Sequence, residues 1–293
     1  MADRFRDKVV VITGTGAGQA RTAALRFAAE GALVVGCDVD GPAANETERL
    51  VRAAGGTIEC LPDVDLTVES EAERVMGFAA DRFGGIDVLY NNATRWAGGS
   101  PTTMDPDAFR WTITNVLDLS WLATKRAYPY MRDRDGASIV FIGSIAGIGG
   151  WTGFPGGSSE TFAYGCAKAA VIRMASVLAI ELAPIRVNVV SPGPIRTVTT
   201  EPVFGEPGTP FHALYRDGML VDRIGEPDDV VSAAMFLTSS EASWVTGQHL
   251  AVDGGFLGSH GAGRPDPAVT GPIAARFSGR ATRASRQQSI EGL

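Results

Sequence analysis

The sequence has few cysteines and few lysines, three of each among 293 residues. The cysteines, Cys37, Cys60 and Cys166, are too few for a disulfide framework and favour a reducing compartment. Lys and Arg number 26 against 33 Asp and Glu, and the net charge of −7 argues against a strongly basic nucleic-acid-binding surface. We see neither a secretory signal nor an apolar run of the ~18–20 residues that span a membrane. These shortages predict a soluble cytoplasmic protein with no nucleic-acid or membrane partner.

Short runs of β-branched residues alternate with Ala-rich stretches of helical periodicity along most of the chain. The run at 9–12 is apolar throughout, which is typical of a strand buried on both faces of a parallel sheet. Asp105-Pro106 predicts the start of a long helix, because Asp can cap it and Pro fits its first turn. The expected strands are 9–12, 33–35, 57–61, 86–90, 139–142, 186–190 and 248–252, and the expected helices are 19–30, 42–54, 67–83, 105–130, 164–182 and 227–239. This order predicts an α/β fold, a Rossmann-type doubly wound parallel sheet with helices on both faces.

The composition changes near the C-terminus. We expect a single domain over residues 1–258, followed by a tail over 259–293. The tail carries a net charge of +3 against −10 for the body, and three prolines interrupt it. Such a segment is either a mobile or surface-draped tail, or an arm that orders against a neighbouring subunit.

A glycine-rich turn, TGTGAG at residues 13–18, joins the first expected strand to the first expected helix. Gly14, Gly16 and Gly18 permit a tight turn and let the backbone approach a pyrophosphate, which the helix N-terminus then binds. In a chain with 36 glycines, a connector without a ligand is the alternative interpretation. The strand-turn-helix context favours the phosphate site.

Asp38 follows the second expected strand, 20 residues after Gly18. An acidic side chain at this position can accept hydrogen bonds from a ribose diol and repels a 2′-phosphate. Residues 13–20 hold no Lys or Arg to attract that phosphate, and neither do Val39 and Asp40. The pattern favours NAD(H) over NADP(H), with an ordinary turn aspartate as the alternative.

Tyr164 and Lys168 are four residues apart, a spacing that places both side chains on one face of a helix. A nearby ammonium stabilises a phenolate and lowers the pKa of the phenol from ~10 toward the range of a general base. The alternative is a pair on a helix surface without a catalytic role.

These motifs resemble those of the classical short-chain dehydrogenase/reductase family, over residues 5–256. The turn at 13–20 is similar to the family's TGxxxGxG, and Tyr164 with Lys168 is similar to its YxxxK pair. Further matching segments are Asp63-Val64 beside the adenine, Asn91-Asn92-Ala93 for the family's NNAG, Asn115 and Ser144 in the catalytic tetrad, Pro192-Gly193 with Ile195 and Thr197 at the nicotinamide, and Val252-Asp253-Gly254-Gly255 in the last strand.

The resemblance implies a cofactor site and a mechanism. The residues that would bind NAD(H) are Gly14, Gly16, Gly18, Gln19, Ala20, Asp38, Val39, Asp63, Val64, Asn91, Ala93, Tyr164, Lys168, Pro192, Gly193, Ile195 and Thr197. Tyr164 would take a proton from the substrate hydroxyl while hydride passes to the nicotinamide, and Ser144 would hydrogen-bond the substrate oxygen. Lys168 would hold the nicotinamide ribose, and Asn115 would position a water of the proton relay. The resemblance also implies a homotetramer.

Three departures from the family pattern stand out. Ala20 replaces the last glycine of the turn, and Thr94 replaces the glycine of NNAG. Ser144 and Tyr164 are 20 residues apart, which is longer than is usual in the family. The extra residues form an insertion at about 149–160, which we expect to border the active site.

The residues expected around the substrate are mostly large and apolar, although such residues are core residues by default. They are Trp96, Ser144, Ile145, Trp151 and Phe154, with Phe211 and Met219 in a lid over about 198–222. This lining favours a bulky hydrophobic alcohol or ketone, cyclic or aromatic, as the small-molecule substrate. Three alternatives stay open: a cis-dihydrodiol dehydrogenase, an enoyl reductase and a non-catalytic NAD-binding regulator. No metal site is predicted.

Overall fold

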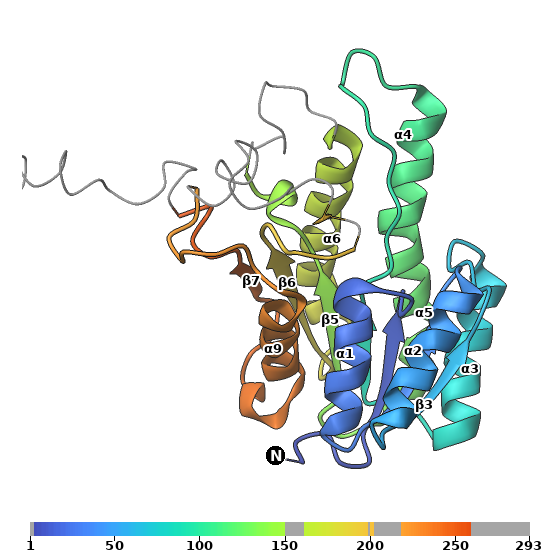
Figure 1. The fold of residues 1–293 in the computed structure, drawn as a ribbon. Helices are drawn as coiled ribbons and strands as arrows, with labels where there is room; N and C mark the ends of the chain where they lie inside the picture. The colour runs from blue at the N-terminus through green and yellow to red at the C-terminus, as the bar shows by residue number, and fades with distance from the viewer. Residues whose placement is uncertain (1–2, 150–160, 199, 202–217, 259–293) are drawn as a thin grey trace, which may run out of the picture.

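The computed structural model describes residues 3–149, 161–198, 200–201 and 218–258. In this part of the chain, parallel strands form one seven-stranded sheet in the order β3-β2-β1-β4-β5-β6-β7 (Figure 1). The strands are β1 (Val9–Thr13), β2 (Leu33–Cys37), β3 (Thr57–Leu61), β4 (Val88–Asn91), β5 (Ser138–Ile142), β6 (Arg186–Pro192) and β7 (His249–Val252). The chain first winds outward from β1 to β3 and then returns across β1 to β4. This reversal confirms the doubly wound α/β fold and predicts a ligand site at the carboxyl ends of the strands beside it.

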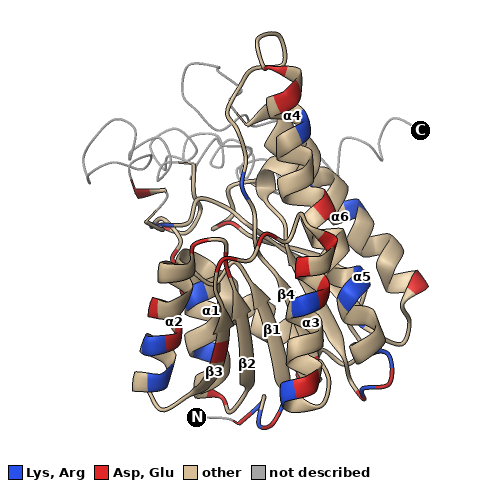
Figure 2. Cartoon of the chain, turned by 90° about the vertical axis from the view of Figure 1, so that its right-hand side faces the viewer, with Lys and Arg blue, Asp and Glu red and all other residues tan. Residues whose placement is uncertain are grey.

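Helices cover both faces of the sheet. One face carries α1 (Gly18–Ala29), α2 (Gly41–Ala53) and α9 (Pro227–Thr238), and the other carries α3 (Glu69–Phe83), α5 (Leu119–Met131) and α6 (Phe162–Glu181). Charged residues of both signs lie along α2 and α3, on the outside of the two layers (Figure 2). The central strands β1, β4, β5 and β6 are buried throughout between the two layers.

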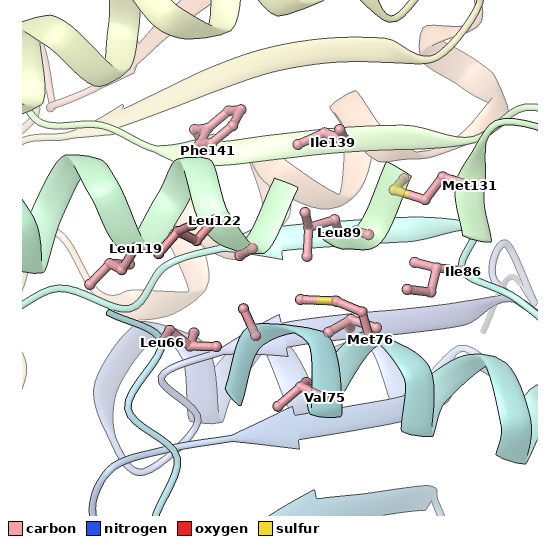
Figure 3. Packing of buried hydrophobic residues seen from close by; sticks show 14 of the residues in the cluster. Leu66, Val75, Met76, Ile86, Leu89, Leu119, Leu122, Met131, Ile139 and Phe141 are labelled. Atoms are coloured by element: carbon pink, nitrogen blue, oxygen red, sulfur yellow. The ribbon is translucent and has the colours of Figure 1, made fainter. Parts of the chain in front are cut away.

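The position of β1 between two core clusters explains why its apolar residues do not alternate with polar ones. Val9 and Val11 belong to a core cluster with α3, α5 and α6, whereas Val10 and Ile12 belong to a second cluster with α1 and α9. Figure 3 shows the first cluster, in which side chains of α3 and α5 lie over β4 and β5. Fully burying one such side chain contributes about 1.5–3 kcal/mol. The packing of both clusters fixes the positions of the carboxyl ends of the strands, where the ligand site is predicted.

The long helix predicted over 105–130 contains an interruption. Asp105 caps it as predicted, since its side chain accepts hydrogen bonds from the N–H groups of Asp107 and Ala108. α4 (Pro106–Ile113) then passes into a π-helical turn (Thr114–Asp118) before α5 begins. Apolar periodicity does not reveal one extra residue in a turn, although π-helical turns are frequent at functional sites.

Several predicted features fall outside the described residues. They include nearly all of the insertion at 149–160, most of the lid at 198–222 and the whole tail at 259–293. Trp151, Phe154 and Phe211 lie there as well. The boundary at residue 258 therefore stays a prediction.

Among the described helices, α6 is long and apolar enough to span a membrane by length and composition alone, with a mean hydropathy of 1.4. The expectation that no segment meets this criterion is wrong. A core helix of a soluble protein passes the same test, and α6 packs against β6 with the side chain of Lys168 buried. The helix is therefore weak evidence for a membrane span.

Candidate active site

A cleft of about 440 Å³ lies at the carboxyl ends of the strands beside the reversal between β1 and β4. All but four of the predicted cofactor residues line it, and the four that do not are Gly16, Ala20, Asp63 and Asn91. Asp65, Arg95 and Leu119 also line it, although the sequence analysis did not single them out. The sequence did contain one indication of Arg95, because this residue follows Thr94, which replaces the glycine of the family's NNAG segment.

The glycine-rich turn brings the start of α1 to this cleft. Gly14 has a φ of +76°, and a Cβ atom there would lie 2.9 Å from the Cα atom of Ala93, so only glycine fits. Gly18 opens α1 with a φ of +55°. Ala17 caps the helix without a side-chain hydrogen bond, which leaves the first N–H groups of α1 available to an anion.

Asp38 is held by two backbone groups. Its Oδ2 atom accepts a hydrogen bond from the Gly16 N–H at 2.7 Å, and its Oδ1 atom accepts one from Asp40 at 2.9 Å. Arg21, just beyond the residues searched for basic side chains, donates from Nε to the Thr47 hydroxyl at 2.9 Å and from Nη2 to the Gly16 carbonyl. The carboxylate is thus oriented by the turn, and the nearest arginine along the chain is engaged elsewhere.

The four predicted residues that do not line the cleft lie just behind it. Ala20 is fully buried in α1, and Gly16 contacts Asp38 as described above. Asn91 Nδ2 donates to the Thr124 hydroxyl of α5 at 3.1 Å, which braces the end of β4. The Asp63 carboxylate lies against Gly41, while the neighbouring Val64 lines the cleft.

Tyr164, Lys168 and Ser144 come together at this cleft. α6 places Tyr164 and Lys168 one turn apart, and Ser144 follows the end of β5. The Tyr164 side chain hydrogen-bonds to that of Ser144. Lys168 Nζ donates to the carbonyl of Ile142 at 2.7 Å and lies 5.6 Å from the centroid of the Tyr164 ring.

Burial controls the protonation of this pair. It raises the pKa of Tyr164, while the hydrogen bond with Ser144 acts in the opposite direction. It also lowers the pKa of the Lys168 ammonium to about 7. The expectation that Lys168 lowers the pKa of the phenol below its ordinary value is wrong for this structure, because burial raises that pKa and outweighs the one opposing influence, the hydrogen bond with Ser144.

Asn115 lies in the π-helical turn and is only 2% exposed. Its Nδ2 donates to the Trp111 carbonyl at 2.9 Å, and its Oδ1 accepts from Arg95 Nε at 2.9 Å. The turn packs against α6, the helix that carries Tyr164 and Lys168. Asn115 is therefore held next to α6 by the side chain of Arg95, which belongs to none of the motifs found in the sequence.

Trp96 and Ile145, predicted to contact substrate, lie outside the cleft lining. Trp96 is 40% exposed and packs on Tyr164, with the two ring centroids 5.4 Å apart. Ile145 is buried with Met219 and Phe256 in a small apolar cluster. Trp96 thus borders Tyr164, whereas Ile145 supports the loop after Ser144.

The site fits a dinucleotide. The uncapped start of α1 and the close-fitting Gly14 provide room and donors for a pyrophosphate, and Asp38 offers a carboxylate to a ribose diol. Gln19 at the start of α1 also has a buried Oε1 atom without a hydrogen-bond partner among the described residues. These features combine the donor set and the space that such a cofactor requires.

Comparisons with known proteins agree with this geometry. Residues 14–257 match the model of a family described as enoyl-(acyl carrier protein) reductase. The meso-2,3-butanediol dehydrogenase of Serratia marcescens is 33% identical over 266 residues, which cover 88% of this chain and 98% of the relative. The trans-4-hydroxycyclohexanecarboxylate dehydrogenase of Sinomonas cyclohexanicum is 33% identical over 265 residues, covering 87% and 95% respectively.

Solved structures point to the same family. A 7α-hydroxysteroid dehydrogenase in complex with NADH and 7-oxo-glycochenodeoxycholic acid has a TM-score of 0.76 at 31% identity, covering 86% of this chain and 96% of its own. The family model, the relatives and this structure all match most of the chain. The protein therefore belongs to the short-chain dehydrogenase/reductase family of oxidoreductases.

Proposed function

We propose that this protein is an NAD-dependent oxidoreductase that interconverts a secondary alcohol and a ketone, with Tyr164 as the general base. The observation that carries the proposal is the convergence of the Tyr164 phenol, the Ser144 hydroxyl and the Lys168 ammonium on one cleft that Asp38 also lines. A site that places an acid–base group beside a dinucleotide site has the parts that alcohol oxidation needs.

Each member of the tetrad has a distinct task. Tyr164 accepts the proton of the substrate hydroxyl, and Ser144, already hydrogen-bonded to the phenol, donates to the substrate oxygen as its charge develops. Lys168 would bind the nicotinamide ribose, and Asn115 would hold a water that leads the proton away. When bound, NAD⁺ supplies the hydride acceptor. Gly18 and the N–H groups at the start of α1 would bind its pyrophosphate, and Gly14 would leave room for it.

The preference for NAD over NADP rests on Asp38. Its two oxygens are oriented by the N–H groups of Gly16 and Asp40, so the carboxylate stays at the edge of the cleft. A ribose diol donates hydrogen bonds to such a group, whereas a 2′-phosphate is repelled by it. Arg21 does not compensate, because its guanidinium bonds to Thr47 and to backbone carbonyls.

We propose a bulky cyclic alcohol or ketone as the substrate. Trp96, which packs on the ring of Tyr164, supports an apolar wall beside that residue. Among the relatives, one is named for a cyclohexane carboxylate and a solved structure holds a steroid acid, although another is named for the small 2,3-butanediol. The aromatic wall favours the cyclic class.

We further propose a homotetramer in the cytoplasm. Trp121, Val177 and Ile180 are 47%, 40% and 78% exposed on α5 and α6, and a groove of about 390 Å³ lies between these helices. Apolar patches of this kind mark association surfaces. A monomeric mass in light scattering at micromolar concentration would contradict the assembly. The three cysteines are free thiols, which supports a reducing compartment.

The activity is tested by NADH absorbance with NAD and a panel of secondary alcohols. The panel contains cyclohexanols, a steroid alcohol, a terpene alcohol, a cis-dihydrodiol and 2,3-butanediol. We expect turnover of a cyclic secondary alcohol and none with the Tyr164→Phe variant, although both proteins bind NADH in a fluorescence titration. Binding of NADH without turnover of any alcohol or ketone would contradict the proposal.

A further inference from the structure

Arg95 holds Asn115 at two points. The backbone N–H of Arg95 donates to the Asn115 carbonyl at 3.2 Å, and its Nε donates to Asn115 Oδ1 at 2.9 Å. Both oxygen atoms of the buried asparagine therefore accept a hydrogen bond from one residue of another segment. The contact lies between the loop after β4 and the π-helical turn.

The π-helical turn explains why the Asn115 carbonyl can accept this bond. In an α-helix that carbonyl would accept from the N–H of Leu119, four residues later. Here Leu119 donates instead to the carbonyl of Thr114, five residues back. The Asn115 carbonyl, without the N–H of Leu119, accepts the N–H of Arg95.

The far end of Arg95 is also held. Its Nη2 donates to Asp65 Oδ2 at 3.0 Å, and Asp65 in turn accepts from the Thr67 N–H and hydroxyl at 3.0 and 2.7 Å. The guanidinium carbon lies 5.7 Å from the ring centroid of Trp111, whose carbonyl holds the Asn115 amide. A planar guanidinium is suited to such a divided contact.

Stability alone does not account for this arrangement. The side chains of Arg95 and Asp65 are 40% and 43% exposed, and ion pairs at such exposure contribute little to folding. The hydrogen bond to Asn115 reaches a residue that is almost fully buried beside the helix of Tyr164 and Lys168. Asp65 and Arg95 line the cleft, so the guanidinium connects its wall to the catalytic turn.

We propose that Arg95 is a positioning residue that acts through Asn115. It fixes the side chain of Asn115 through its guanidinium and the Asn115 carbonyl through its backbone N–H, so that Asn115 keeps one orientation beside the helix of Tyr164 and Lys168. The inference rests on the proposed function, because it assigns Arg95 a task in the same reaction. The competing interpretation is that Arg95 binds an anionic group of the substrate directly.

A double-mutant cycle tests the proposal. Arg95→Met should lower kcat by about tenfold or more, a part of the 10²–10⁴ that positioned acid–base groups supply, with KM and NADH affinity changed less than about threefold. Because Arg95 acts through Asn115, the double variant with Asn115→Leu should be no slower than Asn115→Leu alone. Additive losses would overturn the proposal, as would a rise in KM confined to anionic substrates.

The chemistry of the contact is tested with Arg95→Lys. A lysine keeps the charge but lacks the planar fork that reaches Asn115 and Asp65 together, so we expect kcat to stay close to that of Arg95→Met. Recovery of wild-type kcat by lysine would show that the charge alone matters and would overturn the proposal. Arg110→Gln is the matched control, since Arg110 is an exposed arginine on α4 paired with Asp107.

Hydrogen exchange gives a measurement that does not need turnover. Arg95→Met should speed amide exchange in peptides that cover the π-helical turn (Thr114–Asp118) and leave β1 and α1 unchanged, whereas Arg110→Gln should change neither. Unchanged exchange in the turn would overturn the positioning role even if the enzyme is active. Faster exchange in a protein that oxidises no alcohol would instead support the positioning of Asn115 by Arg95 and refute the proposed function.

Discussion

The two sides of the cleft differ in what holds them in place. On the side proposed to bind the cofactor, called the cofactor side below, backbone conformation sets the geometry, with Gly14 and Gly18 at positive φ and the Asp38 carboxylate held by N–H groups. On the side proposed to carry the chemistry, called the catalytic side below, side chains from separate segments set it, with Arg95 on Asn115 and Trp96 on Tyr164. A backbone-built site can be predicted from a glycine pattern, whereas a side-chain-built site depends on residues that belong to no motif.

The largest effect is expected on the catalytic side, where one oxygen atom decides the chemistry. Tyr164→Phe removes the phenol hydroxyl and keeps the ring that packs on Trp96. We expect kcat to fall by a factor of order 10²–10⁴, with NADH affinity nearly unchanged. Steady-state kinetics and a fluorescence titration measure the two quantities. Retention of more than about a tenth of the activity would mean that another group is the base.

On the cofactor side, Asp38→Ser removes the carboxylate and keeps a hydroxyl. We expect the ratio of kcat/KM for NAD to that for NADP to fall by about 10- to 100-fold, since a charged hydrogen bond contributes about 1.5–3 kcal/mol and the repulsion of the 2′-phosphate is lost. Asp40→Ser is the control on the neighbouring residue. A wild-type enzyme that uses both cofactors equally would contradict the role of Asp38.

Gly14→Ala tests whether backbone fit holds the cofactor side. The added Cβ atom would lie 2.9 Å from the Ala93 backbone at a φ of +76°, so we expect a loss of roughly 2 kcal/mol in the free energy of unfolding and weaker NADH binding. Gly84→Ala is the matched control, because Gly84 has a φ of +85° and nothing within 4 Å of the added atom. The control should lose only the conformational part, about 1 kcal/mol, and keep NADH affinity. Equal NADH affinity in both variants would refute the close-fit explanation.

The smallest effect is a pH dependence on the catalytic side. Burial lowers the pKa of Lys168 to about 7, so the unfolded chain binds more protons than the folded one between about pH 7 and 10.5. The penalty for burying the charged ammonium is complete below pH 7 and is relieved as pH rises. The free energy of unfolding of the cofactor-free protein, relative to Lys168→Met, should therefore rise with pH by at most about 1.4 kcal/mol per unit.

Denaturant titrations of both proteins at pH 6, 7, 8 and 9 measure this difference. Because other titrating groups are shared by the two proteins, they cancel when the variant is subtracted. A difference that is flat or falls between pH 7 and 9 would mean that Lys168 is not held in a neutralising environment.

The α/β order of elements was predictable because buried parallel strands carry uninterrupted apolar runs, as at 9–12, and because Asp105-Pro106 marks a helix start by local chemistry. The π-helical turn was not predictable in this way. One extra residue rotates the apolar face that follows it, but the period of the apolar residues on either side stays that of a helix. The direction of the Tyr164 pKa shift also escaped prediction. A sequence shows that an ammonium is one helical turn away, but burial of the phenol depends on how α6 packs.

Local motifs therefore determined the fold class, the glycine-rich turn, the place of Asp38 after β2 and the pairing of Tyr164 with Lys168, since each depends on backbone conformation or on residues a fixed number of positions apart. Tertiary structure alone decided that Arg95 binds Asn115, that Trp96 packs on Tyr164 and that Asp63 lies beside Gly41 rather than in the cleft lining. These contacts join segments whose distance in space is set by the packing of helices on the sheet. The number of residues between two positions does not show how the helices pack on the sheet.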